Sequence, residues 1–168
     1  RGRSMAVPPV KEEALRRGIP VFQPEKARHP DAVARIASEA PDLIVVVAYG
    51  HILPKSILDI PRFGCINVHA SLLPKYRGAA PINWAVARGE TVTGVTIMRM
   101  DEGMDTGPAL HVREVPIGEE DTAETLYPIL SALGAEALGE GVARAGRGVD
   151  AHGSPSLSAR TPERVTSS

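Results

Sequence analysis

The sequence predicts an α/β domain with an open, mostly parallel sheet, helices on both faces and a β-hairpin near residues 93–115. Three observations lead to this fold class. Segments with strand patterns alternate with segments of helical pattern, which favours parallel strands joined by helices. Residues 43–49 are all apolar, and so uniform a run indicates a central strand covered on both faces. Two β segments, 93–100 and 109–115, flank an acidic turn with two glycines, which is typical of an antiparallel hairpin.

Composition and charge exclude several classes of protein. The 168 residues contain 19 Lys and Arg against 20 Asp and Glu, so the chain is nearly neutral and is not a polybasic tail. The apolar run 43–49 is far shorter than the roughly 20 residues that a membrane helix needs. Cys65 is the single cysteine, so neither an internal disulfide nor a CxxC zinc motif is predicted. We therefore expect a metal-free protein of the reducing cytoplasm.

The first predicted element is a surface helix over residues 10–17. Glu12 with Arg16, and Glu13 with Arg17, have the i, i+4 order that favours ion pairs on a helix. We therefore expect both pairs to form.

A brief strand is expected over residues 19–22, and a second helix follows it. Asp31 can cap this helix, and Pro41 stops it. Its apolar face consists of Val33, Ile36, Ala37 and Ala40.

The middle of the chain continues the alternation of helices and strands. A short helix is expected over 54–60, and a strand over 64–69 becomes polar at its far end. A further helix is expected over 78–88, with Pro81 in its first turn.

The last predicted element is a long helix that begins after the hairpin. Asp121 and Glu124 resemble a capping box at its start. From residue 146 onward the composition shifts to Gly, Ser, Pro, Thr and Arg, so we interpret 1–145 as the domain and 146–168 as a disordered tail. One stripe of the helix is apolar and consists of Leu126, Ile129, Leu130, Leu133 and Ala137.

Two polar side chains, Asn67 and His69, lie at the end of the strand predicted over 64–69. Residues i and i+2 of a strand project to one side, so the amide and the imidazole share one wall. In an open α/β sheet, ligands bind beyond the carboxyl ends of the strands, where these two residues fall. From spacing alone, a half-exposed strand with a polar outer face is an equal alternative.

The stretch 67–74 (NVHASLLP), together with Asp105 in MDTGP, resembles the signature of the 10-formyltetrahydrofolate-dependent formyltransferases. The stretches 77–82 and 94–98, and the basic Arg1-Gly2-Arg3, are similar to the branch of that family that acts on initiator methionyl-tRNA. The resemblance covers residues 1 to about 143 and implies the Rossmann-like sheet of that family.

The resemblance implies three catalytic residues. Asn67 would donate its amide N–H to the oxyanion formed at the formyl group, and His69, cationic or proton-bearing, would stabilise the same charge or shuttle protons. Asp105 would orient His69 and help to deprotonate the attacking amine. Without the resemblance, Asp105 reads as an ordinary turn acid.

The resemblance also implies two binding regions. The donor, 10-formyltetrahydrofolate, would contact Ser71, Leu72, Leu73 and Pro74, together with backbone of 46–52 and of 101–105. As composition alone, this loop could equally be a buried connection. The initiator methionyl-tRNA would contact the basic residues Arg1, Arg3 and Lys11, for which the alternative is a frayed, solvated terminus.

Members of that family carry a strand-helix-strand unit ahead of the position of Arg1, and the branch that acts on methionyl-tRNA continues after the catalytic domain into a small β-barrel. The resemblance therefore implies a partial catalytic domain of a protein that is monomeric at full length, and without the first strand the 43–48 strand would expose an apolar edge. Alternatives are a sibling enzyme acting on a sugar or small amine, a formyltetrahydrofolate hydrolase, or an inactive folate-binding remnant. A dinucleotide-binding dehydrogenase is rejected, because the Gly-x-Gly at 139–141 ends a helix and does not follow a strand.

Overall fold

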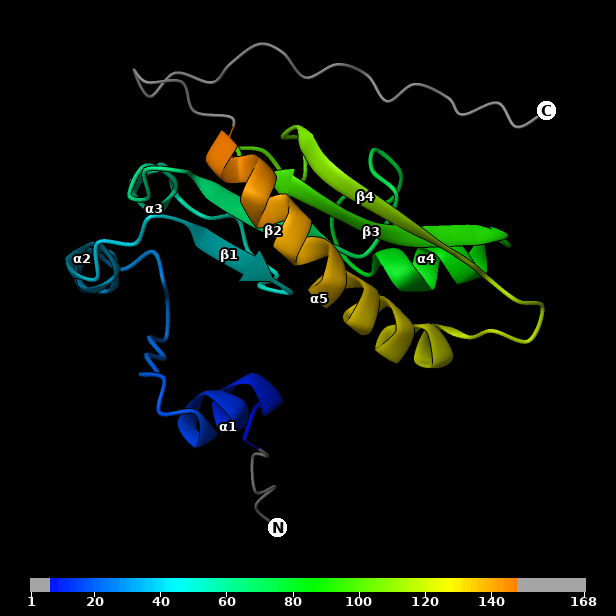
Figure 1. Cartoon of the computed structure of the whole chain (residues 1–168), viewed down its shortest axis with the longest axis horizontal. Coiled ribbons are helices and arrows are strands. Elements are labelled where there is room, and N and C mark those ends of the chain that lie inside the picture. The colour runs from blue at the N-terminus through cyan, green and yellow to red at the C-terminus, as the bar shows by residue number, and fades with distance from the viewer. Residues whose placement is uncertain (1–6, 148–168) are drawn as a thin grey trace.

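A computed structural model describes residues 7–147, in which four strands form one open sheet (Figure 1). The strands lie in the order β1-β2-β3-β4. β1 and β2 pair in parallel, whereas β2–β3 and β3–β4 pair antiparallel. The predicted hairpin is therefore confirmed, and it extends the same sheet as the parallel pair. The strands are β1 Ile44–Val47, β2 Cys65–His69, β3 Val92–Arg99 and β4 Ala109–Pro116.

Five helices accompany the sheet within the described residues. The helices predicted over 10–17, 54–60 and 78–88 are confirmed with shifted ends. None of the helices in this range is both long enough and apolar enough to span a membrane. The last helix continues through residues 146 and 147, past the predicted domain boundary, and the rest of the predicted tail lies outside the described residues. The helices are α1 Pro9–Arg16, α2 Pro30–Ser38, α3 Lys55–Leu58, α4 Pro81–Ala87 and α5 Ala123–Arg147.

Helices cover both faces of the sheet, as the sequence predicts. Neighbouring residues of β2 point to opposite faces, with Ile66 packing in the core under α5 and Cys65 in the core under α2 and α3. In Figure 1, α5 crosses β2 and β3 on one side, while α2 and α3 lie toward the β1 end. The α5 side contains Val95, Ile97, Leu126, Leu130 and Ala137, and the other side contains Val46, Ile57, Val33 and Ile36.

α5 approaches the sheet closely because small residues face it. A Cβ atom added at Gly141 would lie 2.4 Å from Cγ2 of Ile97, and one added at Gly134 would lie 3.1 Å from Cγ1 of Val68. Ala137 is fully buried between them. The predicted apolar stripe is only partly confirmed, because Ile129 is 42% exposed. The sheet-facing side of α5 thus combines buried leucines, Leu126 and Leu130, in its first half with small residues that allow close backbone approach in its second half.

β1 lies at the edge of the described sheet and has one strand neighbour, β2. Val45 and Val47 are 40% and 58% exposed, so the prediction of a strand covered on both faces is wrong for residues 7–147. In register these two residues lie opposite Ile66 and Val68, on the α5 side of the sheet. The apolar edge expected without a further strand is therefore present.

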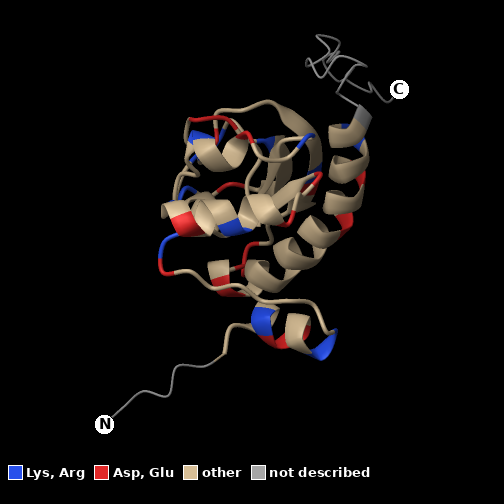
Figure 2. Cartoon of the chain, turned by 90° about the vertical axis from the view of Figure 1, so that its left-hand side faces the viewer, with Lys and Arg blue, Asp and Glu red and all other residues tan. Residues whose placement is uncertain are grey.

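Two predictions near the N-terminus need correction. Residues 19–22 form no strand in the described part of the chain, and Pro20 among them lacks a backbone donor. Glu13 binds both Arg16 and Arg17, so the predicted Glu12–Arg16 pair does not form. Figure 2 shows both signs of charge on α1.

Two helix caps also differ from the sequence predictions. His29 is the N-cap residue of α2, and Asp31 lies in its first turn. At α5, Thr122 and Thr125 exchange backbone-to-hydroxyl hydrogen bonds at 3.1 and 3.2 Å, in place of the predicted Asp121–Glu124 box. The Asp121 carboxylate instead accepts from the Gly118 amide and the Thr125 hydroxyl, and both bonds lower its pKa.

Candidate active site

β2 places Asn67 and His69 on one face, as their i, i+2 spacing predicts. Asn67 lies beside Val46 of β1 and Met98 of β3, and His69 lies beside Thr96 of β3. His69 is only 6% exposed. Both side chains thus stand on β2, an inner strand of the sheet, where neighbouring backbone holds them in fixed positions.

The turn after β3 is folded by its own side chains and by close backbone contact. Asp101 accepts hydrogen bonds from the Gly103 amide at 3.0 Å and from the Thr106 hydroxyl at 2.6 Å. A Cβ atom at Gly107 would lie 1.9 Å from the carbonyl oxygen of Arg99, so only glycine fits there. This turn returns the chain toward β2 and carries Asp105 with it.

The structure brings the three predicted catalytic residues together. The Asn67 amide nitrogen donates to Oδ1 of Asp105 at 3.1 Å. Nδ1 of His69 lies 3.5 Å from Oδ2 of Asp105, and the two side chains are 7% and 14% exposed. The Gly78 amide also donates to Oδ2, at 2.8 Å. An amide, an imidazole and a carboxylate from two distant segments therefore form one largely buried cluster.

Both ring nitrogens of His69 face oxygen atoms. Nε2 lies 2.9 Å from the backbone carbonyl oxygen of Tyr76, which can only accept. Nδ1 faces the carboxylate of Asp105, which accepts when ionised. The ring is thus held between a carbonyl oxygen on one side and a carboxylate on the other.

The loop after β2 is anchored to β3 through Thr96, which is fully buried. The Thr96 hydroxyl donates to the Ser71 carbonyl at 2.7 Å and accepts from the Leu73 amide at 3.1 Å. The Ser71 hydroxyl donates to the Lys75 carbonyl at 2.6 Å, and the Leu73–Pro74 peptide is cis. These bonds fix the backbone that leads from His69 to Gly78.

The four predicted folate-contacting residues differ in accessibility. Pro74 is exposed and Leu72 and Leu73 are half-buried, so these three present surface to a ligand. Ser71 is fully buried, and its hydroxyl is already bonded within the loop. The Ser71 side chain therefore stabilises the loop from within rather than facing a ligand.

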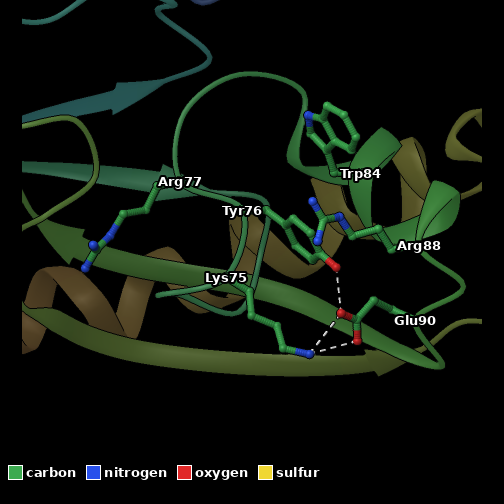
Figure 3. A pocket seen from close by; sticks show the side chains of 6 residues that line it. All are labelled: Lys75, Tyr76, Arg77, Trp84, Arg88 and Glu90. Carbon is green, nitrogen blue, oxygen red and sulfur yellow. Dashed lines mark hydrogen bonds and ion pairs between the residues drawn. The ribbon is translucent and has the colours of Figure 1, made fainter.

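Glu90 holds the same loop from the outside (Figure 3). Its carboxylate accepts from Nζ of Lys75 at 2.8 and 2.9 Å and from the hydroxyl of Tyr76 at 2.6 Å. These hydrogen bonds, that of Lys75 first, hold the pKa of the Glu90 carboxyl below its usual range. Since the Tyr76 carbonyl faces His69, Glu90 is linked to the cluster through one residue.

Sequence reasoning missed Thr96, Glu90 and the backbone of Tyr76 and Gly78. A hydroxyl residue inside the apolar strand 94–98 was a usable signal for Thr96. The backbone groups carry no signal of their own, because every residue has a carbonyl and nearly every residue has an amide.

The predicted RNA-binding residues are not brought to this cluster. Lys11 is on α1, which lies apart from the sheet in Figure 1, and its Nζ donates to Oε1 of Gln23 at 2.6 Å. Arg1 and Arg3 lie outside the described residues.

A known protein family matches most of this sequence. The sequence model of the family described as formyl transferase matches residues 1–142. The chain belongs to the formyl transferase family. The resemblance recognised in residues 67–74 and Asp105 is thereby confirmed at the level of the family.

Individual relatives agree with this assignment. The chain is 57% identical over 140 residues to a methionyl-tRNA formyltransferase of Trichlorobacter lovleyi, which covers 83% of the chain and 44% of the relative. It thus spans less than half the length of that curated relative. Among solved structures, phosphoribosylglycinamide formyltransferase from Bacillus halodurans superposes with a TM-score of 0.73 at 30% identity, covering 84% of this chain and 76% of the other.

A solved structure that resembles this chain contains a folate. The chain resembles HypX from Aquifex aeolicus, solved in complex with tetrahydrofolic acid, with a TM-score of 0.61 at 25% identity. The match covers 71% of this chain and 21% of HypX. These likenesses confirm the predicted family fold, an open α/β sheet with helices on both faces.

Proposed function

We propose that the protein transfers a formyl group from 10-formyltetrahydrofolate to the α-amino group of initiator methionyl-tRNA in the cytoplasm. The observation that carries the proposal is the contact of Asn67, His69 and Asp105 within one cluster. The similarity to a methionyl-tRNA formyltransferase supports this acceptor, and the tetrahydrofolate-bound relative supports a folate donor.

The cluster has the groups that formyl transfer requires. The neutral amine attacks the formyl carbon, and the carbonyl oxygen becomes an oxyanion. Asn67 has two amide N–H groups and gives one to Asp105, so the second is free to donate to that oxyanion. A cationic His69 stabilises the same charge.

Proton transfer completes the reaction. Asp105 accepts a proton from the attacking nitrogen, directly or through a water molecule. The departing N10 of the folate takes up a proton as its bond to the formyl carbon breaks, for which His69 is the nearest acid of the cluster. The Leu72–Pro74 surface, with backbone of 46–52 and 101–105, is where we place the folate.

A transfer assay tests the proposal with three acceptors, which are methionyl-tRNA, an amino sugar and water. We expect formyl-methionyl-tRNA as the product, and Asn67→Ala should lower kcat by about 100- to 1,000-fold, as is typical for the loss of one oxyanion donor. Asn83→Ala is the matched control, because Asn83 is exposed on α4 and has no contact with the cluster.

Three results would contradict the proposal. Transfer to the amino sugar but not to the tRNA would favour a sibling enzyme, and release of formate would favour a hydrolase. Binding of the folate without turnover would favour a folate-binding module, for which the exposed edge at Val45 and Val47 is the supporting observation.

A further inference from the structure

Trp84 is the single tryptophan of the chain, and it is 51% exposed. A large aromatic side chain is usually mostly buried, so half-exposure beside charged groups needs a physical reason. Trp84 lies on α4 and lines a hollow of about 470 Å³ on the surface (Figure 3). The other lining residues are Lys75, Tyr76, Arg77, Arg88 and Glu90.

Arg88 links the two aromatic rings of this hollow. Its guanidinium carbon lies 5.6 Å from the centre of the Trp84 ring and 5.9 Å from that of Tyr76. In Figure 3 the guanidinium lies between these two side chains. The Arg88 guanidinium and the Trp84 ring together form a flat surface on which a further planar group can stack.

The hollow has an excess of positive charge. Lys75 and Glu90 neutralise each other at 2.8 Å. Within residues 7–147, neither Arg77 nor Arg88 has a carboxylate at ion-pair distance. Figure 3 shows the Arg77 side chain pointing away from Arg88, so the group beside Trp84 that can bind an anion is the Arg88 guanidinium, whose planar shape matches the oxygens of a phosphate.

The hollow and the catalytic cluster share one loop. Tyr76 lines the hollow with its ring, while its carbonyl oxygen lies 2.9 Å from Nε2 of His69. Two residues later, the Gly78 amide donates to Asp105. A molecule held in the hollow is thus separated from the reacting groups only by this loop.

We propose that the hollow binds a nucleotide of the single-stranded 3′ end of the aminoacylated RNA, with its base stacked on Trp84 and its phosphate at Arg88. The inference rests on the proposed function, in which the reacting amine is attached to that end. Proteins recognise single-stranded RNA by stacking bases on aromatic and guanidinium planes beside positive charge. A chain of glutamates on the folate would also be attracted to the arginines, but it has no ring to use the face of Trp84.

The lone tryptophan provides a direct test, because its fluorescence reports on this hollow only. The probe is an RNA tetranucleotide that ends in CCA, titrated into the full chain at low salt. We expect saturable quenching of the Trp84 emission. With a labelled tetranucleotide, Trp84→Leu should weaken binding about 5- to 150-fold, the range typical for the loss of one stacked base.

Charge is tested separately by the salt dependence of binding. Arg88→Gln should reduce the slope of log K against log salt by about 0.7, as expected when one contact to a single-strand phosphate is lost. Arg62→Gln is the matched control, because Arg62 also stacks on a ring, 5.1 Å from the centre of Phe63, but does not line the hollow. It should leave both affinity and slope unchanged. Circular dichroism and melting temperatures equal to those of the parent establish that the variants fold.

Two results would overturn the inference. One is the absence of quenching together with equal RNA affinity of parent and Trp84→Leu. The other is quenching by tri-γ-glutamate but not by RNA, which would assign the hollow to the folate tail. If the parent formylates methionyl-tRNA while both hollow variants keep its KM, this inference alone fails. If the RNA binds at Trp84 but no formyl transfer occurs, the proposed function alone fails.

Discussion

Replacing Gly141 by Ala should destabilise the protein, whereas the same change at Gly139, two residues earlier in α5, should stabilise it. A Cβ atom at position 141 would lie 2.4 Å from Cγ2 and 2.9 Å from Cβ of Ile97. At position 139 a Cβ atom would meet nothing within 4 Å. Both variants carry the same substitution in the same helix, so a difference in their stability comes from the contact of the added methyl group with the sheet.

The magnitude follows from two opposing effects. An Ala in a helix interior is favoured over Gly by about 0.8–1.0 kcal/mol, which is the whole effect expected at position 139. At position 141 the added methyl group overpacks against Ile97, which is fully buried and β-branched and so cannot turn away. Overpacking of this kind costs about 1–3 kcal/mol, so the free energies of unfolding of the two variants should differ by about that amount.

Thermal and urea unfolding followed by circular dichroism measure this difference. For a chain of this size, 1 kcal/mol corresponds to about 2–4 °C in Tm. Gly139→Ala should therefore melt about 2–4 °C above the parent, and Gly141→Ala should melt below Gly139→Ala by at least a similar amount. Equal stability of the two variants would refute the packing of α5 on β3 as described.

Three further predictions concern the loop and the core. Thr96→Val should lower the free energy of unfolding by about 1–3 kcal/mol for each buried group it leaves unpaired, the Ser71 carbonyl and the Leu73 amide, and urea titration measures this. Burial raises the pKa of the Cys65 thiol to about 11, so it should resist iodoacetamide at pH 8 until the protein unfolds. The folded state favours the neutral thiol, because the pKa of Cys65 is raised from 9.0 to about 11. The stability gained from this difference is present below pH 9.0 and is lost as the pH rises towards 11. The urea midpoint of the parent should therefore fall between pH 8 and pH 10.5 by an amount that Cys65→Ala does not show. Glu90→Gln should lower kcat more than it raises KM, because the loop that carries the Tyr76 carbonyl, opposite the His69 ring, loosens. Glu90→Asp should restore part of kcat. Equal losses of stability and of formyl transfer in Glu90→Gln would count against a positioning role.

The elements that follow from local pattern could be predicted from the sequence. Strand periodicity places Asn67 and His69 on one wall, and the structure has them there. The pairing of Asp105 with them could not come from periodicity, because 36 residues separate it from His69 and turns favour acids without any partner. Only the likeness of the whole motif pointed to that contact.

The errors have a common physical origin in packing. The apolar pattern of α5 rightly counted Leu126 and Leu130 as core residues but wrongly added Ile129, and it missed Gly134 and Gly141, where the helix backbone approaches the sheet. The apolar run of β1 likewise indicates only that both faces of the strand can pack against apolar groups. It does not specify which neighbours lie against Val45 and Val47.

Asp105 determines how the cluster can act, because its carboxylate is the shared acceptor. An ionised carboxylate has about four lone-pair positions. The Asn67 amide occupies one on Oδ1, while the Gly78 amide and the His69 ring occupy two on Oδ2. One position on Oδ1 remains for the attacking amine or for a water molecule between them. The three contacts orient Asp105, and in the proposed reaction the remaining position accepts the proton of the attacking nitrogen while N10 of the folate takes one up, so the transfer releases no net proton.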